Sequence, residues 1–345
     1  MSRVKTERLA GEAGVLRAAE LLRAGGTVAF PTETVYGLGA NALDATAVER
    51  IFAAKERPSW DPVIVHVCDR EMVGRVAEIS VEMARSVEAL MAAFWPGPLT
   101  LLLPRTPAVP DVVTAERSLV GVRMPAHEVA LALIRAAGIP VAAPSANRFG
   151  RTSPTTAGHV LEDLDGRIDA VVDGGPTMVG VESTVLDVGA RVIYRPGAVT
   201  AEMISAVMGE VKVFSEGGIS ASLVRESLPS PGVGLRHYAP RAKLVLVAGS
   251  GGTSVEDAFR ESVERYQAGE EIVGVMLPDD WDASFAAKVF AWGPWGDDEI
   301  LARRVFAGLR ALDEVGATVI LCPVPEGGGV GVALRDRLSK AARAK

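Results

Sequence analysis

Short apolar runs alternate with amphipathic helical patterns through residues 1–214, and several neighbouring runs are separated by only a few residues. Parallel strands need a crossover of a dozen or more residues, so connections this short require antiparallel pairs. The pattern predicts an α/β sheet with antiparallel parts rather than a doubly wound parallel one. Strands are expected at 27–30, 62–67, 99–103, 120–123, 141–143, 170–173, 184–187 and 192–195, and helices at 13–24, from 44 onward, and at 81–94, 127–137, 155–164 and 200–208.

The chain changes character over residues 215–241, which are rich in Gly, Ser and Pro and show no clear periodicity. A structureless connection of this length is usually functional or a tether. From residue 242 a β-α-β-α-β alternation begins, which predicts a second, smaller domain with a parallel sheet. Its strands are expected at 243–248, 272–277 and 318–322, and its helices at 254–267 and 298–314. We therefore predict a first domain over 1–214, a linker over 215–241 and a second domain over 242–345.

Composition narrows the class of protein. A hydrophobic content of 48% with 23% charged residues is typical of a globular chain with a sizeable core. The net charge of −7 and the aromatic content of 5% disfavour a dedicated nucleic-acid binder. The polar N-terminal stretch and the lack of a long apolar run predict a soluble cytoplasmic protein without membrane association. Cys68 and Cys322 lie far apart in apolar stretches and are expected to be buried free thiols.

Two cations stand at the end of a predicted helix. Asp44 suits the N-cap of this helix, and Lys55 lies four residues after Ile51 and so near the inner face. Pro58 follows Arg57 and stops the helix there. Such a pair could hold phosphates, Arg through its planar fork and Lys as a point charge. A solvated surface pair is the alternative.

Polar residues also follow several predicted strands. Ser145 and Asn147 come directly after the strand at 141–143, where they could serve a ligand or a turn of the backbone. Thr32 and Thr34 follow the first strand and could likewise form a turn.

Two charged or titratable residues fall on apolar strands. His66 ends a Val-Ile-Val-His strand, where a histidine of the core is the alternative to a site residue. Arg123 lies on an apolar strand, so a buried position would require an anionic partner.

Several familiar motifs are absent or weak. The P-loop pattern does not occur, and the G-x-G-x-x-A run at 37–42 lacks a clean preceding strand, which favours a turn of small residues over a dinucleotide site. The glycines at 327–329 are also expected to form a turn. The four histidines and two cysteines show no metal-ligand spacing, and no nucleophile–base pair is evident.

Nine strings in order resemble the Sua5/YrdC/YwlC family of threonylcarbamoyl-AMP synthases, and the second domain resembles the C-terminal domain of the longer, Sua5-type members. The strings are TVAFPTETVYGLGA at 27–40, AKERP at 54–58, PVIVH at 62–66, WPGPLT at 95–100, VRMPAH at 122–127, APSAN at 143–147, VESTV at 181–185, RPG at 195–197 and RHYAP at 236–240. The resemblance implies a YrdC-like twisted mixed sheet with helices, followed by a smaller Rossmann-like parallel α/β domain.

The resemblance also implies a reaction. L-threonine, bicarbonate and ATP would give threonylcarbamoyl-AMP and diphosphate, a nucleotidyl transfer that begins synthesis of threonylcarbamoyladenosine in tRNA. Separate threonylcarbamoyl transferases would then use the product on tRNA. Mg²⁺ is expected on the ATP phosphates and not on protein ligands. An RNA-binding module and a carbamoyltransferase are the alternatives; the acidic charge disfavours the first, and missing zinc-finger and acylphosphatase-like segments disfavour the second.

The resemblance assigns roles to individual residues. The catalytic set is Lys55, Arg57, Ser145 and Asn147; ATP would be bound by Lys55, Ser59, Ser145, Asn147, Ser153, Arg195 and Tyr238; threonine would be bound by Thr32, His66, Arg123 and Ser183. In the family the linker folds over the active site and its tyrosine approaches the nucleotide. Gly234 and Leu235 replace the basic and aromatic residues that the family usually has before the Arg-His-Tyr run, so lid contacts there are expected to differ.

Overall fold

The computed structural model describes residues 5–214, 238–249, 252–286 and 288–343. The chain forms two compact units, which are described separately. The first comprises residues 1–149, 153–178 and 182–234, and the second comprises 150–152, 179–181 and 235–345. Most of the predicted linker, including Gly234 and Leu235, lies outside the described residues.

The first unit is built on one mixed sheet, whose strand order is β1-β8-β2-β3-β7-β4-β6-β5-β9-β10-β11. The sheet contains both parallel pairs, such as β4 with β6, and antiparallel pairs, such as β2 with β3, which confirms the predicted mixture. The strands are β1 (Glu7–Leu9), β2 (Val28–Phe30), β3 (Gly37–Asn41), β4 (Ile64–His66), β5 (Leu99–Pro104), β6 (Leu119–Arg123), β7 (Val141–Ala142), β8 (Ala170–Val172), β9 (Thr184–Asp187), β10 (Val192–Arg195) and β11 (Lys212–Val213).

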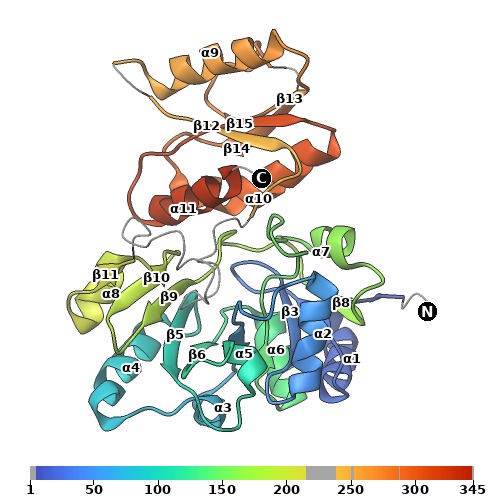
Figure 1. The fold of residues 1–345 in the computed structure, drawn as a ribbon, viewed down its shortest axis with the longest axis vertical. Coiled ribbons are helices and arrows are strands. Elements are labelled where there is room, and N and C mark those ends of the chain that lie inside the picture. The colour runs from blue at the N-terminus through green and yellow to red at the C-terminus, as the bar shows by residue number, and fades with distance from the viewer. Residues whose placement is uncertain (1–4, 215–237, 250–251, 287, 344–345) are drawn as a thin grey trace. The chain divides into compact units, whose positions relative to one another are not determined.

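Helices cover this sheet, and Figure 1 shows α1 packed beside α6 and α4 beside α8. Their apolar faces join the strands in one continuous hydrophobic core. The helices are α1 (Gly11–Arg23), α2 (Ala45–Lys55), α3 (Arg70–Val76), α4 (Val81–Phe94), α5 (Asp111–Thr114), α6 (Glu128–Ala137), α7 (Ala157–Leu164) and α8 (Ala201–Met208).

Helix α2 begins and ends as its sequence predicts. The Asp44 carboxylate accepts hydrogen bonds from the backbone N–H groups of Thr46 and Ala47, so the helix starts there. It ends at Lys55 because Glu56 takes a left-handed conformation with φ of 54°. The helix therefore delivers Lys55 to a fixed position, and the chain leaves it in a new direction toward Arg57 and Pro58.

The expectation of a turn at residues 37–42 is wrong, because Gly37–Asn41 is the strand β3. It pairs antiparallel with β2 and β7, and its glycines allow close packing. A Cβ atom on Gly39 would lie 2.7 Å from both the Phe30 ring and the Val141 side chain. Small residues here serve the contact between neighbouring strands and not a reversal of the chain.

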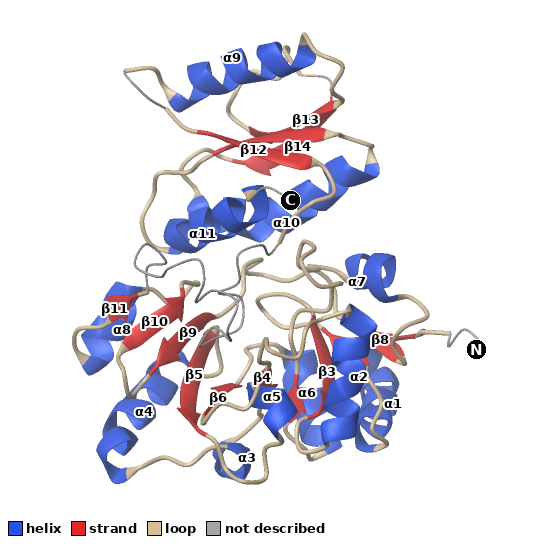
Figure 2. Cartoon of the chain, in the orientation of Figure 1, coloured by secondary structure: helices blue, strands red, loops and turns tan. Residues whose placement is uncertain are grey.

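The second unit holds a four-stranded sheet of order β12-β15-β13-β14, in which every pair is parallel. This confirms the predicted parallel sheet and adds β14 and α11 to the expected elements. Figure 2 shows α9 on one face of the sheet and α10 and α11 on the other. The elements are β12 (Lys243–Val247), α9 (Val255–Gln267), β13 (Val273–Pro278), β14 (Lys288–Gly293), α10 (Asp298–Glu314), β15 (Val319–Pro323) and α11 (Val330–Ala342).

The remaining findings on the fold concern the cysteines and membrane-spanning helices. Cys68 and Cys322 are both buried free thiols, as predicted. Within the described part of the chain, no helix is both long and apolar enough to cross a membrane.

Candidate active site

Lys55 is enclosed where the end of α2 meets the segment after β7. Its side chain is 1% exposed, and its Nζ donates to the backbone carbonyls of Ser145 and Asn147. The same segment is held against β3, because Leu38 N–H donates to the Pro144 carbonyl at 2.8 Å. Burial holds the pKa of Lys55 well below its ordinary value, and Arg57 lowers it further. Three of the four predicted catalytic residues, Lys55, Ser145 and Asn147, are thus brought together.

Arg57 forms a buried ion pair with Asp61. Its Nη2 lies 2.9 Å from the Asp61 carboxylate and 2.8 Å from the Pro62 carbonyl, and both charged side chains are almost fully enclosed. Burial raises the pKa of Asp61, and Arg57 opposes that rise most strongly. Lys55, Arg117 and Arg195 also oppose it, in that order. Asp61 is therefore the centre of a group of four cations.

Lys55, Arg57, Arg117 and Arg195 form a cation cluster around Asp61, because all four act on its carboxylate. A second carboxylate, that of Asp163, interacts with Lys55. Cations gathered at one place create a positive potential, so a cluster of this kind suits a polyanionic ligand.

Arg123 organises a second, electrically neutral group at the end of β6. Its Nη2 lies 2.7 Å from Glu33 Oε1, its Nη1 donates to Thr34 Oγ1 at 3.0 Å, and its Nε donates to the Gly97 carbonyl at 3.2 Å. Thr34 Oγ1 is in turn 2.8 Å from Thr32 Oγ1. The buried arginine therefore has the anionic partner that its sequence position requires. Glu33 Oε1 and Oε2 and Arg123 Nη2 have no partner of hydrogen-bond geometry among the described residues.

His66 lies directly opposite Arg123 in the pairing of β4 with β6. Burial lowers the pKa of His66 to about 3, and Arg123 contributes to the shift. The imidazole is therefore neutral near pH 7. Its Nδ1 finds no hydrogen-bond partner within the described ranges, although the ring packs edge-on against Phe30 at 6.1 Å. A buried, unsatisfied nitrogen of this kind indicates a position prepared for a ligand or a water molecule.

Ser183 connects the predicted threonine residues with the nucleotide residues. Its hydroxyl is 2.8 Å from Thr100 Oγ1 and accepts from Arg195 Nη2 at 3.1 Å. Arg195 Nε also donates to the Ser183 carbonyl at 3.0 Å. Ser153, another predicted nucleotide residue, is buried and donates its hydroxyl to Glu182.

Two predicted nucleotide residues, Ser59 and Tyr238, take no part in the contacts given above. Ser59 is exposed in the turn after Pro58, and its role at the nucleotide stays a prediction. Tyr238 belongs to the second unit, where its ring stacks on Phe306 at 5.6 Å and lies under the Arg337 guanidinium at 5.3 Å. Its role at the nucleotide stays a prediction.

Sequence reasoning missed four charged residues of these groups. Glu33, Asp61 and Glu182 are the partners of predicted residues, and Arg117 joins the cation cluster. Asp61 stands four residues after Arg57, a spacing that could have suggested an ion pair. Glu33 and Glu182 lie inside motif strings, whereas Arg117 lies in none of them.

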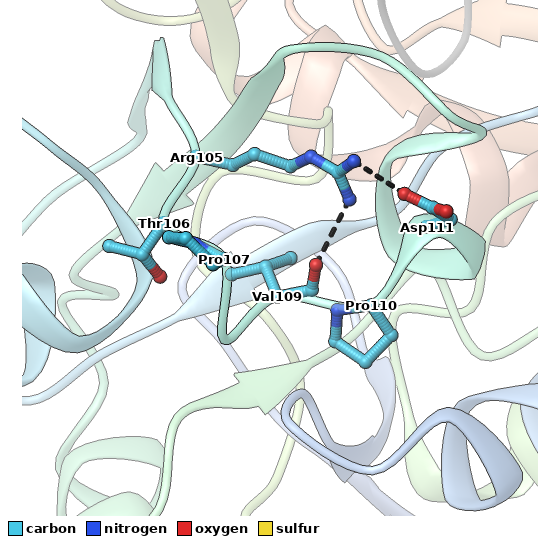
Figure 3. Close-up of a pocket in the computed structure, with 6 residues that line it drawn as sticks. All are labelled: Arg105, Thr106, Pro107, Val109, Pro110 and Asp111. Atoms are coloured by element: carbon cyan, nitrogen blue, oxygen red, sulfur yellow. Dashed lines mark hydrogen bonds and ion pairs between the residues drawn. The ribbon is translucent and has the colours of Figure 1, made fainter.

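A surface pocket of about 440 Å³ lies elsewhere in the first unit, lined by residues 105–107 and 109–111 (Figure 3). Arg105 is already paired there, with the Val109 carbonyl at 3.0 Å and with the Asp111 carboxylate. None of the predicted site residues lines it, so we do not assign the chemistry to this pocket.

Comparison with known protein families agrees with the motif strings. The Sua5_yciO_yrdC family profile, described as telomere recombination, matches residues 20–197. The Sua5_C profile, described as the C-terminal domain of threonylcarbamoyl-AMP synthase, matches residues 199–343. The chain belongs to the Sua5/YrdC family.

Relatives of this Sua5/YrdC chain extend over nearly its full length. It is 43% identical over 326 residues to a threonylcarbamoyl-AMP synthase of Pyrococcus abyssi, covering 94% of this chain and 92% of that one. It is also 43% identical over 332 residues to the Bacillus subtilis protein of the same name, covering 95% and 92%. The crystal structure of P. abyssi Sua5 complexed with L-threonine matches with a TM-score of 0.88 at 42% identity, covering 98% of this chain and 97% of that one.

Proposed function

We propose that the chain is an L-threonylcarbamoyladenylate synthase, a nucleotidyltransferase that converts L-threonine, bicarbonate and ATP into threonylcarbamoyl-AMP and diphosphate. The relatives in P. abyssi and B. subtilis bear this name, and P. abyssi Sua5 has been crystallised with L-threonine. The observation that carries the proposal is the presence of two buried polar groups in one unit. The cation cluster around Asp61 suits a triphosphate, and the neutral group around Arg123 suits an amino acid.

The reaction brings two anions together. The threonine amine and bicarbonate or carbon dioxide form a carbamate, whose oxygen attacks the α-phosphorus of ATP while diphosphate leaves. Such a step depends on positioning and on cations that offset the developing negative charge. Lys55 and Arg57 are proposed to act on the phosphates and the carbamate, and Arg195 on the nucleotide. Ser145, Asn147 and Ser153 are proposed to fix its oxygens.

Threonine recognition is proposed for the second group. Arg123 would bind the carboxylate of threonine, and Thr32, His66 and Ser183 would surround the rest. Because His66 is neutral near pH 7, its unsatisfied Nδ1 can take part in a hydrogen bond with the threonine hydroxyl without adding charge. Discrimination against serine would rest on one methyl group, worth about 1–3 kcal/mol.

Mg²⁺ is proposed to enter with ATP, where it would offset phosphate charge. Across the described residues there is no group of three or more His, Cys, Asp or Glu that could hold a metal ion. Asp61 is engaged by Arg57, which leaves the phosphates and water as the natural ligands of a small hard cation.

Pyrophosphate release tests the proposal. The purified protein is incubated with ATP and Mg²⁺, and release is followed with threonine and bicarbonate each present or withheld. Release that requires both is expected. Release indifferent to threonine would contradict the assignment, and salt-dependent tRNA binding in the absence of ATP would then be measured instead. The mixed anhydride product would serve separate transferases that act on tRNA.

A further inference from the structure

Arg117 lies in the short connection between α5 and β6, and the two terminal nitrogens of its half-buried side chain have no hydrogen-bond acceptor among the described residues. The Nη1 and Nη2 atoms are both buried, and neither finds a hydrogen-bond acceptor among the described residues. A guanidinium carries five N–H donors, and leaving such groups buried and unsatisfied costs free energy. A buried cationic donor without an acceptor therefore calls for an explanation.

The local fold holds Arg117 close to Asp61. Helix α5 packs against α2, and the Val63 N–H donates to the Val113 carbonyl at 2.9 Å, which ties the segment after Asp61 to α5. The backbone N–H of Arg117 donates to the Thr114 carbonyl at 3.3 Å, which holds the residue near the end of α5. Burial lowers the pKa of Arg117 and the charge of Asp61 opposes that shift, so the two groups interact.

Arg117 differs from the other three members of the cation cluster in what its nitrogens contact. Lys55 donates to the carbonyls of Ser145 and Asn147. Arg57 donates to the Pro62 carbonyl and pairs with Asp61, while Arg195 donates to Ser183. Arg117 thus brings the fourth charge to the cluster together with donors that no described residue accepts.

We propose that Arg117 is a phosphate-binding residue of the nucleotide site, which donates its Nη1 and Nη2 hydrogens to phosphate oxygens of ATP. This rests on the proposed function and adds to it a residue that neither the motifs nor the resemblance assigns. The planar fork of arginine matches two phosphate oxygens, and a charge-assisted pair of this kind is stronger than a neutral hydrogen bond. The ligand supplies acceptors for the two buried nitrogens of Arg117.

Titration calorimetry with Mg·ATP, and separately with inorganic pyrophosphate, compares wild type with Arg117→Met. We expect affinity for both ligands to fall about 10- to 100-fold, equivalent to about 1.4–2.8 kcal/mol, with L-threonine affinity unchanged. Arg105→Met is the matched control. Arg105 also precedes β6 in the sequence, but it is already paired with Asp111 and the Val109 carbonyl (Figure 3), so its loss should leave ATP affinity unchanged.

A second comparison separates phosphate binding from a structural role as the partner of Asp61. If Arg117→Met lowers stability because Asp61 loses a countercharge, the double variant Arg117→Met, Asp61→Asn removes both charges. ATP affinity of the double variant should still be at least about tenfold below that of Asp61→Asn alone. Equal affinities in this pair would overturn the inference.

The proposed function and the role of Arg117 fail in different ways. A wild-type protein that binds ATP but releases no pyrophosphate with threonine and bicarbonate contradicts the proposed function, while the Arg117 comparison still decides whether the residue binds phosphate. A fully active wild type whose ATP affinity does not change on removal of Arg117 contradicts only the inference about Arg117.

Discussion

Arg123→Met should destabilise the first unit strongly, because it leaves the Glu33 carboxylate buried without its countercharge. The two side chains are only 4% and 9% exposed and lie 2.7 Å apart. Removing one partner of a buried ion pair costs about 3–5 kcal/mol. At about 2–4 °C per kcal/mol for a unit of this size, the midpoint of its thermal unfolding should fall by roughly 6–20 °C.

A double-mutant cycle with Glu33→Gln measures the pair itself. Thermal unfolding of wild type, both single variants and the double variant is followed by circular dichroism, with attention to the transition of the first unit. The double variant should recover part of the loss, with a coupling free energy of up to about 3 kcal/mol. Purely additive effects would refute the ion pair and with it the neutral character of the Arg123 group.

Three further predictions follow from the structure. Arg57→Ala should lower turnover roughly 100-fold or more, because a donor that stabilises developing negative charge is lost. Turnover is measured in a steady-state assay of pyrophosphate release, and a value within a few-fold of wild type would contradict the role of Arg57. Burial lowers the pKa of His66 to about 3, so below pH 6.5 the unfolded chain binds a proton that the folded chain excludes. Between pH 7 and pH 5 the free energy of unfolding should therefore fall by about 2 kcal/mol more in wild type than in His66→Gln. Urea unfolding at the two pH values measures this difference. Gly39→Ala should destabilise by about 1–3 kcal/mol because its Cβ would meet the Phe30 ring at 2.7 Å, whereas Gly74→Ala, which meets nothing within 4 Å in α3, should stabilise by about 0.5–1 kcal/mol.

Elements with strong local signals were predictable from the sequence. Helix α4, with its apolar periodicity, and strands β9 and β10 lie where the sequence places them. Expected and observed ends of the other predicted elements differ by at most two residues. Strand β3 was missed because its glycines carry no apolar pattern and pack closely against Phe30 of the neighbouring strand and against Val141, which is remote in sequence. Short elements such as β1 and α5 carry too few residues for a periodic pattern.

The site was predictable as a set of motifs but not as a set of contacts. Lys55 and Ser145 stand in separate strings, and only the folded chain brings the Lys55 ammonium to the Ser145 carbonyl 90 positions later. The Glu33 partner of Arg123 lies 90 positions earlier, so local spacing could not name it. Arg117 stands out only because two of its side-chain nitrogens are buried without an acceptor among the described residues, which composition and motif searches do not reveal.

The identity of the product tests the account most directly. Wild-type protein is incubated with ATP, Mg²⁺, L-threonine and isotopically labelled bicarbonate, and the nucleotide products are analysed by mass spectrometry. We predict an adenylate that contains both threonine and the labelled carbon, formed in step with pyrophosphate. An adenylate that lacks the label, or pyrophosphate released without any adenylate of threonine, would contradict the proposed reaction.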